Sequence, residues 1–318
     1  MDSATKLELI KRNVAEIVTE DELKNILKTK RKPVVYCGYE PSGPMHLGHF
    51  VTITKLIDFE KAGFEVKVLL ADVHAMLNRK GAAKEIEKEV ESWKKTIRAI
   101  GLRAQVIVGS KFQFHENYTT DIMAMAQNTT INRGLRSMQE VARDIENATV
   151  SQILYPLMQI EDIKALGCDV AYSGLEQRKI HMLGRELADI TKHKFVAVHT
   201  PLITSLKGPG SKMSKSVPGS GISVTDSDKE IEKSISGAYC PAKVVDDNPV
   251  LQIAELILFP RIKRLEILRP EKFGGNVAFE SYVGLEKAYV DGELHPMDLK
   301  SSITAELIKI ISKIRKNF

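Results

Sequence analysis

The chain has 318 residues, of which 43% are hydrophobic and 27% are charged, and its formal net charge at pH 7 is +5. This length is enough for one large domain and one smaller domain, and no apolar run approaches the roughly 20 residues of a membrane span. The mild positive charge permits a nucleic-acid partner without requiring one.

The cysteines and the first residues bear on the cellular compartment. Cys37, Cys168 and Cys240 are odd in number, scattered and without the spacing of metal ligands. The segment from Met1 to Lys6 lacks the apolar core of a signal sequence. We therefore expect a reducing, cytoplasmic location and no membrane partner.

Residues 3–30 are predicted to form two short amphipathic helices that serve packing. The apolar stripe of the first helix consists of Leu7, Ile10, Val14 and Ile17. The run from Thr19 to Glu22 has the capping-box pattern that begins a second helix. We expect no chemistry from either helix.

An alternation of strand and helix patterns follows. It consists of predicted strands at 34–38, 65–71 and 105–108 and predicted helices at 46–61 and 83–100. This order predicts parallel pairing with right-handed crossovers. Ligands of such sheets bind beyond the carboxyl ends of the strands. The residues at those ends are Tyr36, Gly38, Asp72 and His74.

The turn between the first strand and the first helix of this alternation has the features of a phosphate site. The strand breaks at residues 41–44, Pro-Ser-Gly-Pro, and a helix begins at about His46. A helix N-terminus offers free backbone N–H groups and a positive dipole end. His46 and His49 share one face of the first turn, and Gly48 lets a flat ring lie against the backbone. This combination suits a nucleoside triphosphate, with two ordinary surface histidines as the alternative interpretation.

Residues 112–150 are predicted to be mostly helical and to interrupt the alternation, either as a partner surface or as a solvated helical hairpin. The next predicted helix, from about 150 to 166, carries Tyr155, Gln159 and Asp162 on one face. An exposed helix face usually shows lysine and glutamate instead. The stripe therefore predicts the polar end of a largely apolar pocket, with a chance polar face as the alternative.

The rest of the chain completes the sheet and adds a second domain. Predicted strands at 168–172 and 195–198 flank a helix that begins near Gly174. The segment 205–221 is rich in glycine, serine and lysine, which predicts a mobile, cationic loop. We place the domain boundary just after this loop, and we expect residues 225–318 to be helical without alternation.

Two segments far apart in the chain match the signatures of class I aminoacyl-tRNA synthetases. Residues 46–49, His-Leu-Gly-His, are similar to one signature, and residues 212–216, Lys-Met-Ser-Lys-Ser, match the other in full. Their order and their places, at the first strand–helix turn and between the two domains, make the pair specific. Over essentially its whole length the chain resembles archaeal-type tyrosyl-tRNA synthetases, through further motifs at 36–43, 70–74, 155–159, 174–181 and 295–298.

The resemblance implies an α/β fold in two domains. Residues 1–222 would form a Rossmann-like catalytic domain with a parallel sheet and a helical insertion at 112–150. Residues 223–318 would form a smaller, mainly α-helical C-terminal domain that recognises the anticodon. The implied reaction activates L-tyrosine with ATP to tyrosyl-adenylate and transfers the tyrosyl group to the terminal adenosine of tRNA(Tyr). Mg²⁺ would accompany ATP, and the absence of an acidic cluster in the sequence leaves it without assigned ligands.

The resemblance also implies roles for individual residues. The phenol of the bound tyrosine would contact Tyr36 and Asp162, and its α-ammonium group would contact Tyr155, Gln159 and Gln177. The residues that would lie along ATP are Gly38, His46, Gly48, His49, Lys212, Met213, Ser214 and Lys215. Among them, His46, His49, Lys212 and Lys215 would be catalytic, because charge builds on the phosphates in the transition state. Archaeal relatives often have serine in place of Lys215, so the loop here would hold phosphate more strongly.

The tRNA contacts implied by the resemblance fall in two places. Phe273 would stack on the guanine at the first anticodon position and Asp298 would accept from its N–H groups, with a core anchor as the alternative interpretation of Phe273. Arg136, Arg178 and Lys179 match positions that approach the acceptor stem. The insertion would also make the contact of a homodimer whose two subunits share one tRNA.

Other functions remain open at this point. The sister enzyme for tryptophan shares the fold and both signatures, although an indole has no hydroxyl for Tyr36 and Asp162. A small cofactor-forming nucleotidyltransferase would leave residues 225–318 without a purpose. A catalytically silent RNA-binding relative would not need the intact histidines and lysines. An altered amino-acid specificity is also open, since neighbours such as Leu69 and His74 cannot be judged from sequence.

Overall fold

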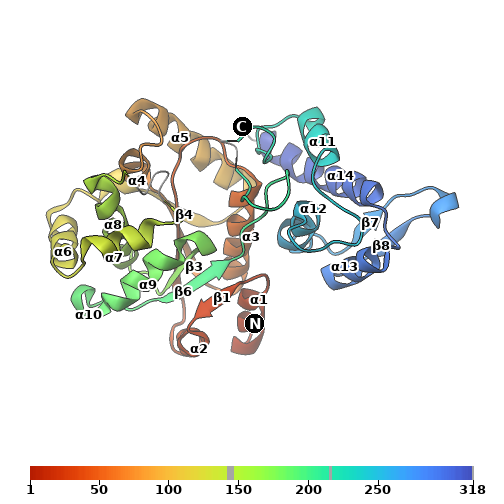
Figure 1. Ribbon diagram of the computed structural model, residues 1–318. Coiled ribbons are helices and arrows are strands. Elements are labelled where there is room, and N and C mark those ends of the chain that lie inside the picture. The colour runs from red at the N-terminus through yellow and green to blue at the C-terminus, as the bar shows by residue number, and fades with distance from the viewer. Residues whose placement is uncertain (142–146, 215–216, 317–318) are drawn as a thin grey trace. The chain divides into compact units, whose positions relative to one another are not determined.

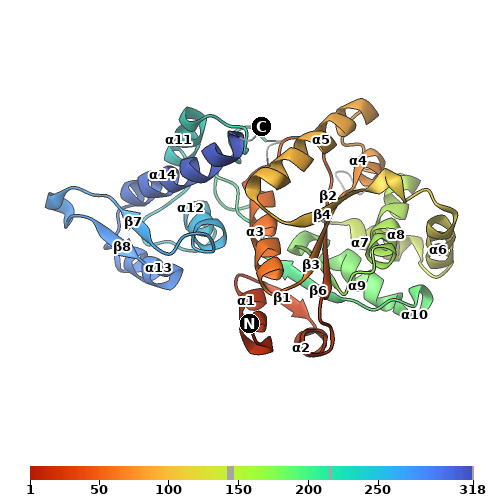
Figure 2. The same ribbon diagram turned by 180° about the vertical axis from the view of Figure 1, so that it is seen from behind.

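The computed structural model describes residues 1–141, 147–214 and 217–316, and Figure 1 and Figure 2 show them from opposite sides. The chain divides into two compact units. The first comprises Met1–Gly43 and Lys55–Pro201, and the second comprises Pro44–Thr54 and Leu202–Phe318. The predicted domain boundary between residues 222 and 223 stays a prediction. The two compact units divide after Pro201 instead, and residues 44–54 belong to the second unit.

A six-stranded sheet forms the centre of the first unit, with the strand order β1-β6-β5-β2-β3-β4. Its strands are β1 (Glu16–Val18), β2 (Val34–Tyr39), β3 (Glu65–Leu70), β4 (Ala104–Val108), β5 (Val170–Gly174) and β6 (Val196–Thr200). Strands β2 to β6 pair in parallel, and β1 pairs antiparallel with β6 at one edge. The predicted α/β fold with parallel pairing is confirmed, and one antiparallel edge strand is added to it.

The winding direction of the sheet reverses beside β2. From β2 the chain proceeds to β3 and β4 on one side, whereas β5 and β6 follow on the other side. Helices α8 (Val150–Ala165) and α9 (Arg178–Glu186) lie on one face of the sheet, and α5 (Ala83–Ile100) lies on the opposite face (Figure 1, Figure 2). Such a switch point opens a ligand crevice at the carboxyl ends of the strands. Tyr36 and Gly38 lie on the strand at this switch point.

The other helices of the first unit are short apart from one that it shares with the second. They are α1 (Ser3–Lys11), α2 (Glu20–Thr29), α4 (Asp72–Leu77), α6 (Glu116–Gln127), α7 (Ile131–Met138) and α10 (Ala188–Thr191), while α3 (Leu47–Lys61) runs from the second unit into the first. Single 3₁₀ turns occupy Gly109–Lys111 and Leu175–Gln177. Helix α5 was predicted from its 3.6-residue periodicity, and it buries the apolar stripe around Trp93. It is capped at its C-terminus by Gly101, whose φ of +85° only glycine adopts readily.

The prediction of a continuous apolar helix stripe through Val14 and Ile17 was wrong. Helix α1 ends at Lys11, and residues 16–18 form strand β1, in which Glu16 stands opposite His199 and Ile17 stands opposite Val198. Ile17 and Val18 are β-branched and suit a pleated edge. The pairing partner lies about 180 residues further along the chain, so local periodicity had no access to it.

The second unit is built around the C-terminal helix α14 (Pro296–Arg315), which buries its apolar stripe. The other helices of the unit are α11 (Asp228–Ser236), α12 (Pro249–Ile253) with a π-helical continuation at Ala254–Leu258, and α13 (Tyr282–Asp291). Helix α11 begins with a capping box between Ser227 and Glu230. Within the described part of the chain, no helix is both long and apolar enough to cross a lipid bilayer.

The expectation that residues 225–318 are purely helical was wrong at one place. Strands β7 (Leu265–Ile267) and β8 (Val277–Phe279) form an antiparallel pair. A 3₁₀ turn at Glu271–Phe273 followed by two glycines with positive φ connects them. Each strand has only three residues, which is too short for a period of two to stand out in the sequence.

Candidate active site

Asp162 on α8 is fully buried, and its two carboxylate oxygens differ in their partners among the described residues. The Oδ1 atom accepts hydrogen bonds from Gln113 Nε2 and Tyr118 OH, both at 2.8 Å. Among the described residues, the Oδ2 atom has no hydrogen-bond partner, and His74 Nε2 lies 3.7 Å from it. Burial raises the pKa of Asp162 to about 8. A buried oxygen without a partner is costly, so Oδ2 is where a hydroxyl of a ligand gains most.

Tyr36 lies in the middle of β2 and is 2% exposed. Burial, together with the nearby carboxyl of Asp162, raises the pKa of Tyr36 well above its usual value. Gly38 leaves the space that the Tyr36 ring occupies, because a Cβ atom at Gly38 would stand 2.5 Å from the Tyr36 hydroxyl. The glycine is therefore a steric requirement for this placement of the phenol.

The remaining polar groups of the stripe on α8 are also buried. Tyr155 packs edge-on against the His74 ring at a centroid distance of 4.5 Å, and its hydroxyl interacts with Glu40. Gln159 is 8% exposed. Gln177 follows β5, and its Oε1 atom is buried without a hydrogen-bond partner in the described part of the chain. Such acceptors are what an ammonium group of a ligand needs.

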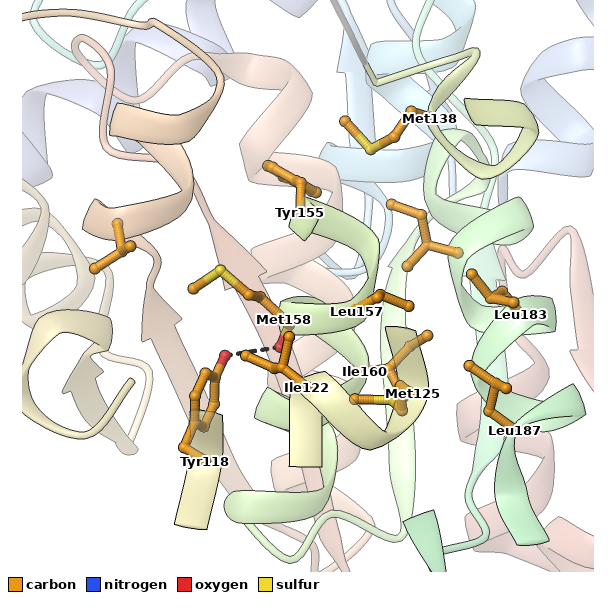
Figure 3. Close-up of a cluster of buried hydrophobic side chains, with 12 residues drawn as sticks. Tyr118, Ile122, Met125, Met138, Tyr155, Leu157, Met158, Ile160, Leu183 and Leu187 are labelled. Atoms are coloured by element: carbon orange, nitrogen blue, oxygen red, sulfur yellow. Dashed lines mark hydrogen bonds between the residues drawn. The ribbon is translucent and has the colours of Figure 1, made fainter. Parts of the chain in front are cut away.

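An apolar cluster includes Tyr155 of this stripe and other buried side chains of α8 (Figure 3). It draws buried residues from α4, α6, α7, α8 and α9, namely Val73, Tyr118, Ile122, Met125, Met138, Tyr155, Leu157, Met158, Ile160, Ile180, Leu183 and Leu187. The Tyr118 hydroxyl also donates to the Met158 carbonyl at 2.9 Å, which ties α6 to α8 (Figure 3). Buried apolar side chains thus accompany the polar stripe on α8, and the apolar pocket with a polar end stays a prediction.

The first signature segment belongs to the second unit. The rings of His46 and His49 lie side by side at a centroid distance of 3.8 Å and an interplanar angle of 31°. The Gly48 N–H donates to His46 Nδ1 at 3.1 Å. A Cβ atom at Gly48 would stand 2.9 Å from His46 Cε1. The two histidines therefore share one face, as predicted, and glycine is needed between them.

Backbone pairing connects the first signature segment to residues 222–224, directly after the 205–221 loop, within the second unit. The Leu47 N–H donates to the Ile222 carbonyl at 2.9 Å, and the Val224 N–H donates to the Met45 carbonyl at 3.0 Å. The carbonyl of Met213 lies 3.7 Å from the Cβ position at Gly48. The backbone around Met213, inside the 205–221 loop, is thus placed beside the histidine segment.

The predicted loop residues differ in their exposure. Lys212 is exposed, whereas Met213 is 3% exposed and its N–H donates to the Ile203 carbonyl at 2.8 Å. The Ser214 carbonyl accepts from the Ser220 hydroxyl. Lys215 and Ser216 lie outside the described residues. Met213 therefore anchors the segment and leaves the side chain of Lys212 in solvent.

A basic groove of about 620 Å³ lies on the first unit and brings together the three residues predicted to approach the acceptor stem. It is lined by Arg133, Arg136, Arg178, Lys179, Met182, Arg185 and Glu186. Lys179 Nζ is 2.9 Å from Glu140 Oε1, and Arg178 Nε is 2.5 Å from Glu16 Oε1. Five basic side chains around one groove suit a phosphate backbone.

The two residues predicted to read the anticodon lie in the second unit. Phe273 is 60% exposed in the turn between β7 and β8, and Lys272 Nζ lies 4.9 Å from its ring centroid. Asp298 is half-buried in the first turn of α14. The alternative interpretation of Phe273 as a core anchor was wrong, because its ring is mostly in solvent.

Comparisons with known proteins decide the family. The family model described as "tRNA synthetases class I (W and Y)" matches residues 28–312. The chain belongs to this family. It is 49% identical over 312 residues to the tyrosine–tRNA ligase of Methanocaldococcus jannaschii, with 98% of this chain and 99% of the relative covered. The crystal structure of the tyrosyl-tRNA synthetase of Archaeoglobus fulgidus, complexed with L-tyrosine, matches with a TM-score of 0.97, 46% identity and 99% of both chains covered.

A solved structure of the tyrosyl-tRNA synthetase of Aeropyrum pernix is also similar, with a TM-score of 0.90 and 38% identity over 100% of this chain and 95% of that one. Membership of the synthetase family rules out the small nucleotidyltransferase. The family description covers both tryptophan and tyrosine enzymes, so the choice of amino acid rests on the site and on the named relatives.

Two residues around Asp162 in this synthetase escaped the sequence reasoning. Gln113 and Tyr118, which supply both hydrogen bonds to Oδ1, lie at the start of the segment interpreted as a partner surface. For Tyr118, the spacing with Ile122 and Met125 was a usable signal, because the three lie on one buried helix face. Gln113 follows a 3₁₀ turn and carried no signal of this kind.

Proposed function

We propose that this synthetase activates L-tyrosine with ATP and transfers the tyrosyl group to the 3′-terminal adenosine of tRNA(Tyr) in the cytoplasm, for protein synthesis. The observation that carries the proposal is the buried Oδ2 atom of Asp162, close to Tyr36, for which the described part of the chain offers no hydrogen-bond partner. A para-hydroxyl completes this site, whereas the indole of tryptophan has no hydroxyl to offer. The relatives named above at 46–49% identity, tyrosine enzymes by name, support the same choice.

The bound tyrosine is held at its two ends. The phenol hydroxyl forms a hydrogen bond with Asp162 Oδ2, and the Tyr36 hydroxyl provides a second polar contact. The α-ammonium group donates to the buried Oε1 of Gln177 and to the side-chain oxygens of Gln159 and Tyr155. Phenylalanine leaves Oδ2 desolvated and unpaired, so the site rejects it by the cost of a missing hydrogen bond.

Activation needs no nucleophile from the protein. The tyrosine carboxylate attacks the α-phosphorus of ATP, the bond to the β-phosphate oxygen breaks, and diphosphate leaves. Negative charge shifts onto the departing phosphates, where His46, His49, Lys212 and Lys215 stabilise it more strongly than in the ground state. Gly38, Gly48, Met213 and Ser214 provide backbone along ATP. Mg²⁺ on the phosphates supplies further charge neutralisation, and no group of three or more potential ligands among the described residues marks a protein site for it.

Transfer of the tyrosyl group requires the tRNA. A ribose hydroxyl of the terminal adenosine attacks the carbonyl carbon of tyrosyl-adenylate, and AMP leaves. Arg136, Arg178 and Lys179 bind the acceptor end through its phosphates and first base pair. Phe273 stacks on the first anticodon base, and Asp298 accepts from its N–H groups.

A homodimer forms through the segment 112–150. Support comes from large apolar side chains that this segment leaves exposed, namely Phe114, Met123, Ile131 and Val150, which are 53–74% exposed. Exposed apolar groups gathered on one segment are typical of an interface.

Pyrophosphate exchange into ATP tests the proposal directly, with each of the twenty amino acids supplied in turn. We expect exchange with tyrosine and at most a trace with phenylalanine and tryptophan. Exchange that depends on tryptophan would assign the chain to the sister enzyme. Failure of all twenty amino acids to support exchange would instead revive the catalytically silent relative.

A further inference from the structure

A chain of four polar side chains leads from the basic groove into the interior of the first unit. Arg178 Nε lies 2.5 Å from Glu16 Oε1, and the same oxygen lies 2.9 Å from His199 Nδ1. His199 Nε2 is 3.0 Å from His181 Nδ1, and the two rings stack at a centroid distance of 5.0 Å. Arg178 is 46% exposed and Glu16 26%, whereas both histidines are fully buried. Glu16 thus lies between the exposed Arg178 and the buried His199.

The sheet register explains this arrangement. Glu16 of β1 stands directly opposite His199 of β6 in the antiparallel pair, so both side chains point to the same face. Arg178 is the first residue of α9. The positive end of a helix dipole disfavours a cation there, and the Glu16 carboxylate compensates.

The two histidines act as neutral groups. Burial lowers the pKa of His181 well below its usual value, and burial lowers that of His199 to about 4 despite the opposing effect of Glu16. Neutral His199 has Nδ1 beside the Glu16 carboxylate without a hydrogen bond between them among the described residues, and its Nε2 atom pairs with His181 Nδ1. The two neutral histidines therefore pack behind Glu16 and leave the charge of its carboxylate unchanged.

Arg178 differs from Arg133 and Arg185, two other arginines of the groove, in the guanidinium nitrogens that lie against a partner. Arg133 spends Nε and one terminal nitrogen on Glu186, and Arg185 spends both terminal nitrogens on the Phe195 carbonyl and Glu22. For Arg178, the nitrogen that lies against a carboxylate is the inner Nε atom, in an ion pair with Glu16 at 2.5 Å. Its two terminal nitrogens keep the fork that binds phosphate or a base edge bidentately.

We infer that Glu16, backed by His199 and His181, is a positioning residue that fixes the Arg178 guanidinium so that its terminal nitrogens meet the acceptor end of the tRNA. This inference rests on the proposed function of the groove. It makes a prediction opposite in sign to simple electrostatics. Neutralising Glu16 adds one positive charge beside the groove, which by itself tightens binding to phosphates. If Glu16 positions Arg178, the same change weakens productive binding.

The test is steady-state aminoacylation of tRNA(Tyr) by Glu16→Gln at fixed ionic strength. We expect KM for tRNA to rise about tenfold, the effect of misplacing one charge-assisted contact, with kcat nearly unchanged. Tyrosine-dependent pyrophosphate exchange should stay within about twofold of the unmodified enzyme, because the groove takes no part in activation. An unchanged or lower KM for tRNA would overturn the inference.

Two further variants separate positioning from other effects. Glu60→Gln makes the same charge change at a matched ion pair outside the groove, where Arg103 Nε lies 2.5 Å from Glu60 Oε1, and it should not raise KM. Arg178→Lys keeps the charge but lacks Nε and the planar fork, so its KM for tRNA should rise as much as that of Glu16→Gln. Because Arg178 is exposed, this variant also tests the inference if Glu16→Gln folds poorly. In an Arg178→Ala background, Glu16→Gln should add nothing.

The same data distinguish failure of the inference from failure of the proposed function. A large loss in Arg178→Ala without any loss in Glu16→Gln would overturn the positioning role and leave the tRNA contact in place. No loss in Arg178→Ala would overturn both for this groove, while tyrosine-specific exchange would still identify the activation reaction.

Discussion

The surroundings of Asp162 and those of Arg178 show two ways in which one chain handles charge. Asp162 is fully buried, burial raises the pKa of its carboxyl, and one of its oxygens has no hydrogen-bond partner within residues 1–141, 147–214 and 217–316. Arg178 is half exposed in a groove with four other cations. A buried group is selective because any ligand that fails to pair with it incurs the full desolvation cost. An exposed cation is weakly selective unless a neighbour fixes its orientation.

The largest expected effect is that of replacing Lys212, an exposed cation, and it tests how much such a cation contributes to the reaction. Lys212→Ala should slow tyrosyl-adenylate formation by about 100-fold, because the negative charge on the departing phosphates increases in the transition state. The dissociation constant for tyrosine should stay within about twofold. Single-turnover kinetics and equilibrium dialysis measure the two quantities. Lys207→Ala, an exposed lysine of the same loop, is the matched control, and equal losses in rate and tyrosine affinity would contradict the role of Lys212.

The selectivity of the buried group should be the next largest effect. In Asp162→Asn, the two donors Gln113 and Tyr118 hold the amide oxygen in place of Oδ1, so the NH₂ group replaces Oδ2 and can no longer accept from a phenol. The preference for tyrosine over phenylalanine in pyrophosphate exchange should fall about tenfold or more. Asp121→Asn, a partly exposed carboxylate on α6 that pairs with Lys164, should leave it unchanged. An unchanged preference for tyrosine over phenylalanine in Asp162→Asn would show that the buried carboxyl is not the source of selectivity.

The smallest of the three effects concerns the anticodon. Asp298→Ala should raise KM for tRNA with guanine at the first anticodon position by about tenfold, the range of one base contact. With that guanine replaced, the variant and the unmodified enzyme should become alike. Asp291→Ala, an exposed carboxylate at the end of α13, serves as the control. Unchanged charging of the natural tRNA by the Asp298 variant would refute the contact.

The sequence predicted well what depends on long periodic segments. The helices around Trp93 and Asp162 and the parallel strands followed from 3.6-residue periodicity and from the order of elements. The histidine and lysine signatures were visible because each lies within five consecutive residues. These features are local, so one stretch of sequence contains all the information about them.

The features that escaped prediction depend on partners distant in the chain. Strand β1 exists because Glu16 pairs with His199, and Asp162 is completed by Gln113 and Tyr118 from another element. The strands around Leu265 and Phe279 are only three residues each. The side-chain chain from Arg178 to His181 likewise becomes apparent only when the sheet register is known.

The pairing of residues 45–47 with residues 222–224 has a consequence for building chimeric enzymes. Leu47 and Phe50 are fully buried in the second unit, which consists of residues 44–54 and of the chain from position 202 onward. A hybrid joined at position 202 therefore takes the backbone partner of its histidine segment from a different parent. A junction placed after Val224 keeps both halves of this pairing from the same parent, so swaps of anticodon modules should begin there.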